Sequence, residues 1–199
     1  MRNPTGKFRM EIIGKNGIPK TEYDYKGETF VESCKGEKYS IRLHNDSPYV
    51  ILFVPSVDGL SVINGEEASK NSGGYLIRPW GSLNVPGWRL NDKEEEVTHF
   101  CFDSIPQVYA SQMGTPNNIG VIGAIIYYEE KQKLTPFKFE RADSPTDRMI
   151  IRYDYYEGLK GRGIQVVPEH QRNTSNDRIM AADPFPGDKD CRPPERWTE

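Results

Sequence analysis

Glycine and proline divide this chain of 199 residues into many short apolar stretches. The 18 glycines and 15 prolines are spread along the sequence instead of gathering in one linker. Several of the stretches between them alternate apolar and polar residues, with the period of two that a strand with one solvated face requires. This spacing predicts an all-β protein, specifically an antiparallel β-sandwich of the jelly-roll or immunoglobulin-like kind.

The clearest strand patterns lie in the first third of the chain. Phe8, Met10 and Ile12 alternate with charged residues, and the same period recurs over residues 38–43. Residues 49–54 form a continuous apolar run, which predicts a strand buried on both faces. A longer run over residues 119–128 predicts a central strand. Shorter strands are expected over residues 75–77, 82–85, 88–90, 97–102 and 149–155.

Short sequence motifs predict the turns and a few short helices. Asn16 with Gly17, and Asn64 with Gly65, predict hairpins because these residue types adopt positive φ at low cost. Asp58 precedes another glycine in a predicted turn, so its carboxylate is assigned a structural role. Helices are expected only as short connectors, over residues 104–114 and 155–161.

The composition changes at Gln165. Residues 1–164 are predicted to form one β-sandwich domain. Residues 165–199 are rich in Pro, Asp, Asn and Arg and carry few large apolar side chains, so they cannot bury enough surface to fold alone. They are predicted to form an extended C-terminal arm that a partner orders. Its predicted partner-binding residues are Ile179, Met180, Phe185 and Trp197.

Charge and hydropathy exclude several classes of protein. The formal net charge is −3, and basic residues are interleaved with acidic ones, which argues against nucleic acid as a partner. No apolar run approaches the roughly 20 residues needed to cross a bilayer, so no membrane association is predicted. The first residues lack the apolar region of a signal peptide, which predicts synthesis in the cytoplasm.

The residues that could support catalysis or bind a metal are few. His99 and Cys101 share one face of a predicted strand, and His44 or Cys34 could complete a metal site or a Cys–His nucleophile. A strand whose intervening phenylalanines face the core explains the same pattern. Because no metal-binding or nucleophile motif accompanies these residues, no metal, no cofactor and no enzymatic activity are predicted. A jelly-roll or cupin-like enzyme is kept as the third hypothesis.

Three aromatic residues lie close together among glycines and prolines: Tyr75, Trp80 and Trp88. Exposed rings of this kind could stack on sugars or anchor a protein interface. The second functional hypothesis is therefore a carbohydrate-binding β-sandwich module. Filling of the core is expected to account for most of the aromatic residues.

One block of sequence resembles a group of uncharacterised proteins from bacteria and tailed phages. It comprises residues 57–65, Ala68 with Ser69, Gly74 with Tyr75, Pro79, residues 87–89 and residues 118–123, within a similarity that spans residues 39–163. The group has no assigned activity, so the resemblance implies no catalytic residue.

The resemblance favours a component of a virion or of another surface structure. The first functional hypothesis is therefore a non-enzymatic protein such as a capsid decoration or minor structural protein of a tailed phage. The arm would bind capsid or other structural subunits, and many symmetric copies would strengthen weak contacts. The expected location is the virion after synthesis in the host cytoplasm, otherwise the cytoplasm, with an oligomeric state left open.

Overall fold

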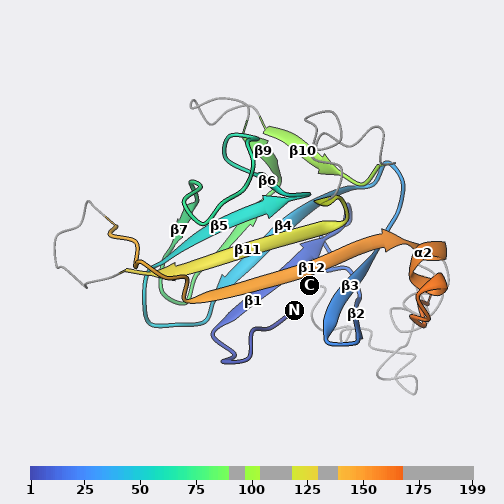
Figure 1. The fold of residues 1–199 in the computed structure, drawn as a ribbon, viewed down its shortest axis with the longest axis horizontal. Coiled ribbons are helices and arrows are strands. Elements are labelled where there is room, and N and C mark those ends of the chain that lie inside the picture. The colour runs from blue at the N-terminus through green and yellow to red at the C-terminus, as the bar shows by residue number, and fades with distance from the viewer. Residues whose placement is uncertain (90–96, 104–117, 130–138, 168–199) are drawn as a thin grey trace, which may run out of the picture. The chain divides into compact units, whose positions relative to one another are not determined.

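Two β-sheets make up most of the computed structural model, which describes residues 1–89, 97–103, 118–129 and 139–167 (Figure 1). The prediction of an all-β sandwich is confirmed. Residues 1–166 form one compact unit. The described residues end at 167, so the four predicted partner-binding residues of the arm, Ile179, Met180, Phe185 and Trp197, lie outside them.

The first sheet has five strands, and all of its pairings are antiparallel. Its order is β1 (Phe8–Ile13), β4 (Lys38–Asn45), β10 (Val97–Cys101) and β9 (Gly87–Arg89), with β8 (Ser82–Val85) also paired to β4. The alternation predicted for β1 and β4 is confirmed, because Phe8, Met10 and Ile12 are buried while the residues between them reach solvent.

The second sheet has seven strands. Its order is β2 (Glu22–Tyr25), β3 (Glu28–Ser33), β12 (Asp147–Tyr155), β11 (Val121–Tyr128), β5 (Ile51–Val57) and β6 (Leu60–Ser61), with β7 (Tyr75–Ile77) also paired to β5. The pair β3–β12 is parallel, so this sheet is mixed and not wholly antiparallel. Parallel neighbours need a long connection, and more than half of the chain separates these two strands.

The main core combines side chains from both sheets. The five-stranded sheet contributes Phe8, Met10, Ile41, Leu43 and Phe100, among others, and the seven-stranded sheet contributes Ile51, Phe53, Ile122, Ile126, Met149 and Ile151. The prediction that the run near residue 50 is buried on both faces is confirmed. In β5, Ile51 and Phe53 enter this core, while Leu52 and Val54 pack with Tyr127 in a second cluster.

A short helix, α2 (Tyr156–Gly161), follows β12, as the sequence predicts for residues 155–161. Its Leu159 is fully buried and packs with Phe30 of β3 and with Ile164. The helix therefore covers one end of the seven-stranded sheet. The connector predicted over residues 104–114 lies outside the described residues. No helix in the described part of the chain is long and apolar enough to cross a membrane.

One of the two tightest turns, at Asp58 and Gly59, was expected from the sequence, and the other was not. Asp58 and Gly59 both have positive φ, 52° and 81°, and form a two-residue turn between β5 and β6. Lys26 and Gly27 do the same between β2 and β3, a hairpin that the sequence pattern did not indicate because Lys is not a typical turn residue. At the two predicted Asn-Gly hairpins the glycine alone has positive φ, so these connections are longer turns.

Candidate functional site

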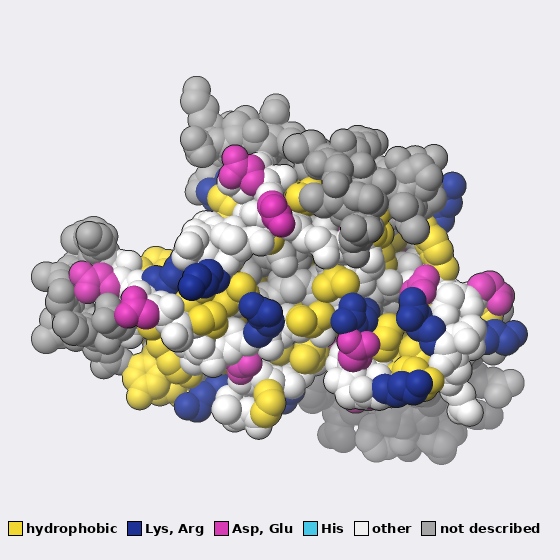
Figure 2. All heavy atoms as spheres, in the orientation of Figure 1, with side chains coloured by type: hydrophobic (Ala, Val, Ile, Leu, Met, Phe, Trp, Pro, Cys, Tyr) yellow, Lys and Arg dark blue, Asp and Glu magenta, His cyan; other side chains and the backbone are white. Residues whose placement is uncertain are grey.

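The outer faces of the two sheets differ in chemistry. The five-stranded sheet presents polar residues to solvent, including Arg9, Glu11, Ser40, Arg42 and His44. The seven-stranded sheet instead presents an apolar strip between charged groups. Figure 2 looks onto the strands β11 and β12, where basic and hydrophobic side chains alternate. A sheet that is apolar on both faces needs a cover on the second face.

That cover is present at two places on the face. Near β2 and β3, the helix α2 and residues 162–166 pack over Phe30. Near β5, the loop at residues 69–72 is held against Tyr127, whose hydroxyl donates to the carbonyl oxygen of Lys70 at 2.8 Å. Arg141 donates to the carbonyl oxygens of Lys70 and Ser72, and its guanidinium lies over the Tyr127 ring at 4.8 Å. The part of the face between these two covers contains two hollows.

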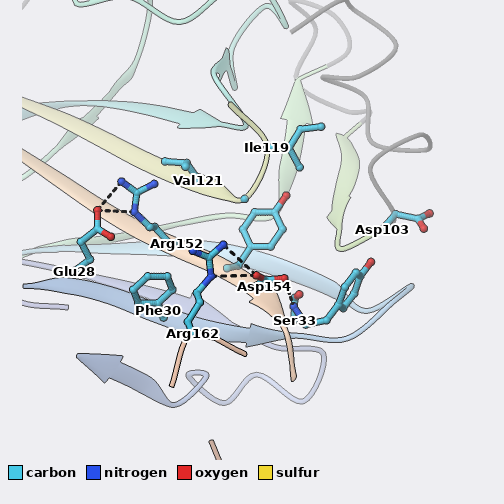
Figure 3. Close-up of a pocket in the computed structure, with 12 residues that line it drawn as sticks. Glu28, Phe30, Ser33, Asp103, Ile119, Val121, Arg152, Asp154 and Arg162 are labelled. Atoms are coloured by element: carbon cyan, nitrogen blue, oxygen red, sulfur yellow. Dashed lines mark hydrogen bonds and ion pairs between the residues drawn. The ribbon is translucent and has the colours of Figure 1, made fainter. Parts of the chain in front are cut away.

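The first, which we call the helix-side hollow, measures about 360 Å³. Its apolar wall includes Phe30, Ile119 and Val121. Two arginines of this hollow each hold an acidic partner (Figure 3). Arg152 donates from Nε to Glu28 at 2.7 Å, and Arg162 donates from Nε to Asp154 at 3.4 Å. Each guanidinium of this hollow therefore has an acidic neighbour, although the Arg162 side chain is 58% exposed.

A phenol on the wall of the same hollow lacks a partner. The hydroxyl oxygen of Tyr155 is buried and has no hydrogen-bond partner in the described structure. Burial, followed by the charge of Asp103, raises the pKa of this phenol. The group is therefore neutral at physiological pH, and its hydroxyl is enclosed by the surrounding residues.

The second, which we call the loop-side hollow, measures about 300 Å³. Ile125 and Ile150 form its apolar surface, and Gly123 leaves room above Ser56, because a Cβ at that glycine would lie 2.7 Å from the serine oxygen. The positively charged side chain of Arg148 is exposed at this hollow and has no ion pair among the described residues.

The two hollows share Val121, and we refer to the pair as the trough. Apolar side chains, among them Val121, Ile125 and Ile150, line it together with charged ones such as Arg148 and Arg152. Such a surface suits an extended polypeptide with apolar anchors better than a small molecule, which prefers a deep and enclosed pocket. Reasoning from the sequence did not identify the trough. The signal was available in β12, where Met149, Ile150 and Ile151 are consecutive apolar residues and therefore point to both faces.

The three aromatic residues selected from the sequence have different environments. Trp88 is partly buried, contacts Phe100 edge-to-face at 5.4 Å and packs against the core. Tyr75 is also partly buried and packs against the core. Trp80 is 70% exposed. The structure therefore leaves Trp80 as the one mostly exposed ring of the three.

The structure also shows the positions of His44, His99 and Cys101, which the sequence singled out as candidate metal ligands or nucleophiles. Phe100 and Phe102 face the core, while His99 and Cys101 are exposed on the other side of the chain. His44 lies on the outer face of β4, where its Nε2 is 2.9 Å from Glu11. Within the described residues, no three His, Cys, Asp or Glu side chains are grouped so that they could hold a metal.

Asp58 is buried in the turn between β5 and β6, at 2% exposure. Its carboxylate accepts hydrogen bonds from the hydroxyl of Tyr153 at 2.8 Å and from the backbone N–H of Gly120 at 2.9 Å. Burial raises the pKa of Asp58 above its ordinary value, against the opposing effect of these hydrogen bonds. These two hydrogen bonds connect the turn to β12, through Tyr153, and to the segment that leads into β11, through Gly120. The carboxylate therefore has a structural role.

Comparison with known proteins adds no relative: no family model matches the chain, and no significant match was found among the curated proteins or the solved structures.

Proposed function

We propose that this protein is a non-enzymatic structural protein that binds neighbouring protein subunits, with a virion of a tailed phage as its setting. The observation that carries the proposal is the trough on the seven-stranded sheet, an apolar strip left between two covers on a face that would otherwise need burial. The setting comes from the sequence resemblance described above.

The occupant that we propose for the trough is the C-terminal arm of a neighbouring copy of the chain. The arm places Ile179 and Met180 between Asp177 and Asp183, and Phe185 follows shortly after. Arg178 lies between Asp177 and Ile179, so the segment carries both signs of charge. Its apolar residues can cover the apolar floor, and its acids can pair with Arg148, which has no ion pair among the described residues. An extended segment of the length of residues 168–199 spans up to roughly 100 Å, which is enough to reach another subunit.

Complementation between two full-length variants tests this contact. Ile150→Asp places a charge on the floor of the trough and leaves the arm intact, whereas Phe185→Asp damages the arm and leaves the trough intact. Light scattering over a range of concentrations should show self-association of the wild-type chain and little association of either variant alone. An equal mixture should form dimers, since one intact arm then meets one intact trough.

Two controls make the result interpretable. Arg42→Asp alters the polar outer face of the other sheet and should associate like the wild type. Urea unfolding of each variant should show that the fold persists. A wild-type chain that is monomeric at every concentration contradicts self-assembly, and a mixture that fails to associate contradicts the pairing of arm and trough.

The virion setting has a separate test. The protein should band with purified phage particles in a density gradient and be detected there by mass spectrometry, and deletion of residues 165–199 should abolish this incorporation. A chain found only in the soluble lysate, away from particles that are otherwise complete, contradicts the virion assignment.

A further inference from the structure

The turn at residues 78–81, between β7 and β8, places a tryptophan where a glycine is normally required. The N–H of Gly81 donates to the carbonyl oxygen of Arg78 at 3.1 Å, Pro79 follows Arg78, and Trp80 has a φ of +57°. Proline at the second position and positive φ at the third define a type II turn, in which the third residue is usually Gly or Asn. A bulky residue with positive φ is an outlier that the surrounding structure must hold in place.

Asn45, the last residue of β4, holds this turn. It is fully buried, and its side-chain amide donates to the carbonyl oxygens of Tyr49 and Arg78 at 2.7 and 2.9 Å. Its backbone N–H donates to the carbonyl oxygen of Gly81 at 2.8 Å. The N–H of Trp80 donates in turn to the carbonyl oxygen of Ser47 at 3.2 Å. The backbone conformation of Trp80 is therefore determined by a buried network and not by its own side chain.

The indole ring contributes little to the fold. It is 70% exposed, it belongs to none of the packed hydrophobic clusters, and it makes no aromatic ring contact with a described residue. Pro79 beside it is exposed, and the other exposed residues nearby in sequence, Arg78, Ser82 and Asn84, are polar. A single aromatic ring with mostly polar neighbours differs from a protein-binding hot spot, which lies at the centre of a desolvated apolar region.

From this arrangement we infer that Trp80 is a stacking platform for a sugar ring. The negative face of the indole attracts the weakly positive C–H groups on one face of a pyranose, and the neighbouring polar side chains can bond its hydroxyls. The rigid turn reduces the conformational entropy that the ring would lose on binding. This site is separate from the trough and does not depend on the function proposed for it.

The test uses the full-length chain on an array of pyranose-containing oligosaccharides, followed by titration calorimetry with the best-binding sugar. Trp80→Gly removes the ring and places the residue that the turn prefers. We expect sugar affinity to fall by at least about tenfold, the size of effect typical of a ring that anchors a ligand. The thermal midpoint should stay at or above that of the wild type, because positive φ costs glycine nothing.

Two further variants complete the design. Trp80→Tyr keeps an aromatic face and should retain part of the affinity. Leu76→Ala removes another exposed apolar side chain, 55% exposed on β7, and should leave affinity unchanged. A wild-type chain that binds no sugar on the array, or a Trp80→Gly variant that binds as tightly as the wild type, overturns the inference. So does Trp80-dependent capture of a protein partner in the absence of sugar binding.

Discussion

The hydroxyl of Tyr153 lies 2.8 Å from each of the two carboxylate oxygens of Asp58. This contact joins the turn between β5 and β6 to β12, and the N–H of Gly120 adds a bond from the segment that leads into β11. Three pieces of chain that are distant in sequence therefore meet at one buried carboxylate. Burial raises the pKa of Asp58 and of Tyr153.

Removal of the Tyr153 hydroxyl should destabilise the fold. In Tyr153→Phe the buried carboxylate of Asp58 loses its side-chain donor, and we expect the free energy of unfolding to fall by about 1–3 kcal/mol in urea titrations. Tyr155→Phe is the matched control, since that hydroxyl has no partner in the described structure, and it should change stability by less than about 0.5 kcal/mol. Equal losses in the two variants would argue against a structural role for the Asp58 contact.

Asp58 should also make stability depend on pH. Its pKa in the folded protein is raised above the ordinary value of 3.8, so the folded state favours the protonated acid. The stabilisation from this group is complete below pH 3.8 and is lost as pH rises through the raised pKa. The stability of the wild type minus that of Asp58→Asn should therefore decrease as pH rises from below 4. A difference that is constant across this window, or that increases, would contradict the raised pKa.

Asn45 should be among the polar residues that stability depends on most. Asn45→Asp replaces an amide that donates to three carbonyl oxygens with a carboxylate that repels them. We expect a loss of at least about 3 kcal/mol in the free energy of unfolding. Asn84→Asp is the control, because Asn84 is exposed and accepts from Ser40 through an oxygen that Asp retains. Its effect should stay within about 0.5 kcal/mol.

Two glycines should respond to alanine in opposite ways. A Cβ at Gly87 in β9 would lie 2.0 Å from the backbone oxygen of Thr98 in β10, so Gly87→Ala should separate these strands. The expected loss is about 2–4 kcal/mol, measured by thermal and urea unfolding. A Cβ at Gly161 in α2 meets nothing within 4 Å, and Gly161→Ala should be neutral or stabilising by up to about 1 kcal/mol. Comparable losses at both sites would contradict the close approach of β9 and β10.

The sequence pattern predicted most strands because local alternation is enough to distinguish a buried face from a solvated one. Phe8 and Met10 in β1, and Ile41 and Leu43 in β4, point inward as their spacing requires. The pattern missed the β2–β3 hairpin, where a Lys occupies a positive-φ position and where five successive residues of β3 are buried. A strand covered on both faces has no alternation to detect.

The candidate sites were less predictable. Trp80 and Trp88 are eight positions apart and chemically identical, yet one is exposed and the other packs against the core. Their difference comes from the network around Asn45 and from the packing of Phe100, neither of which is local. The trough likewise depends on how far α2 and the loop at residues 69–72 extend over the sheet.

By itself, the sequence determined the class of fold, the positions of most strands and the inward faces of β1 and β4, because these follow from contacts of each residue with its near neighbours in the chain. The tertiary structure decided the parallel pairing of β3 and β12, the partners of Asp58 and the exposure of Trp80. The bonds to Asp58 join residues 62 and 95 positions apart, and no local pattern encodes which distant strands come together around a buried group.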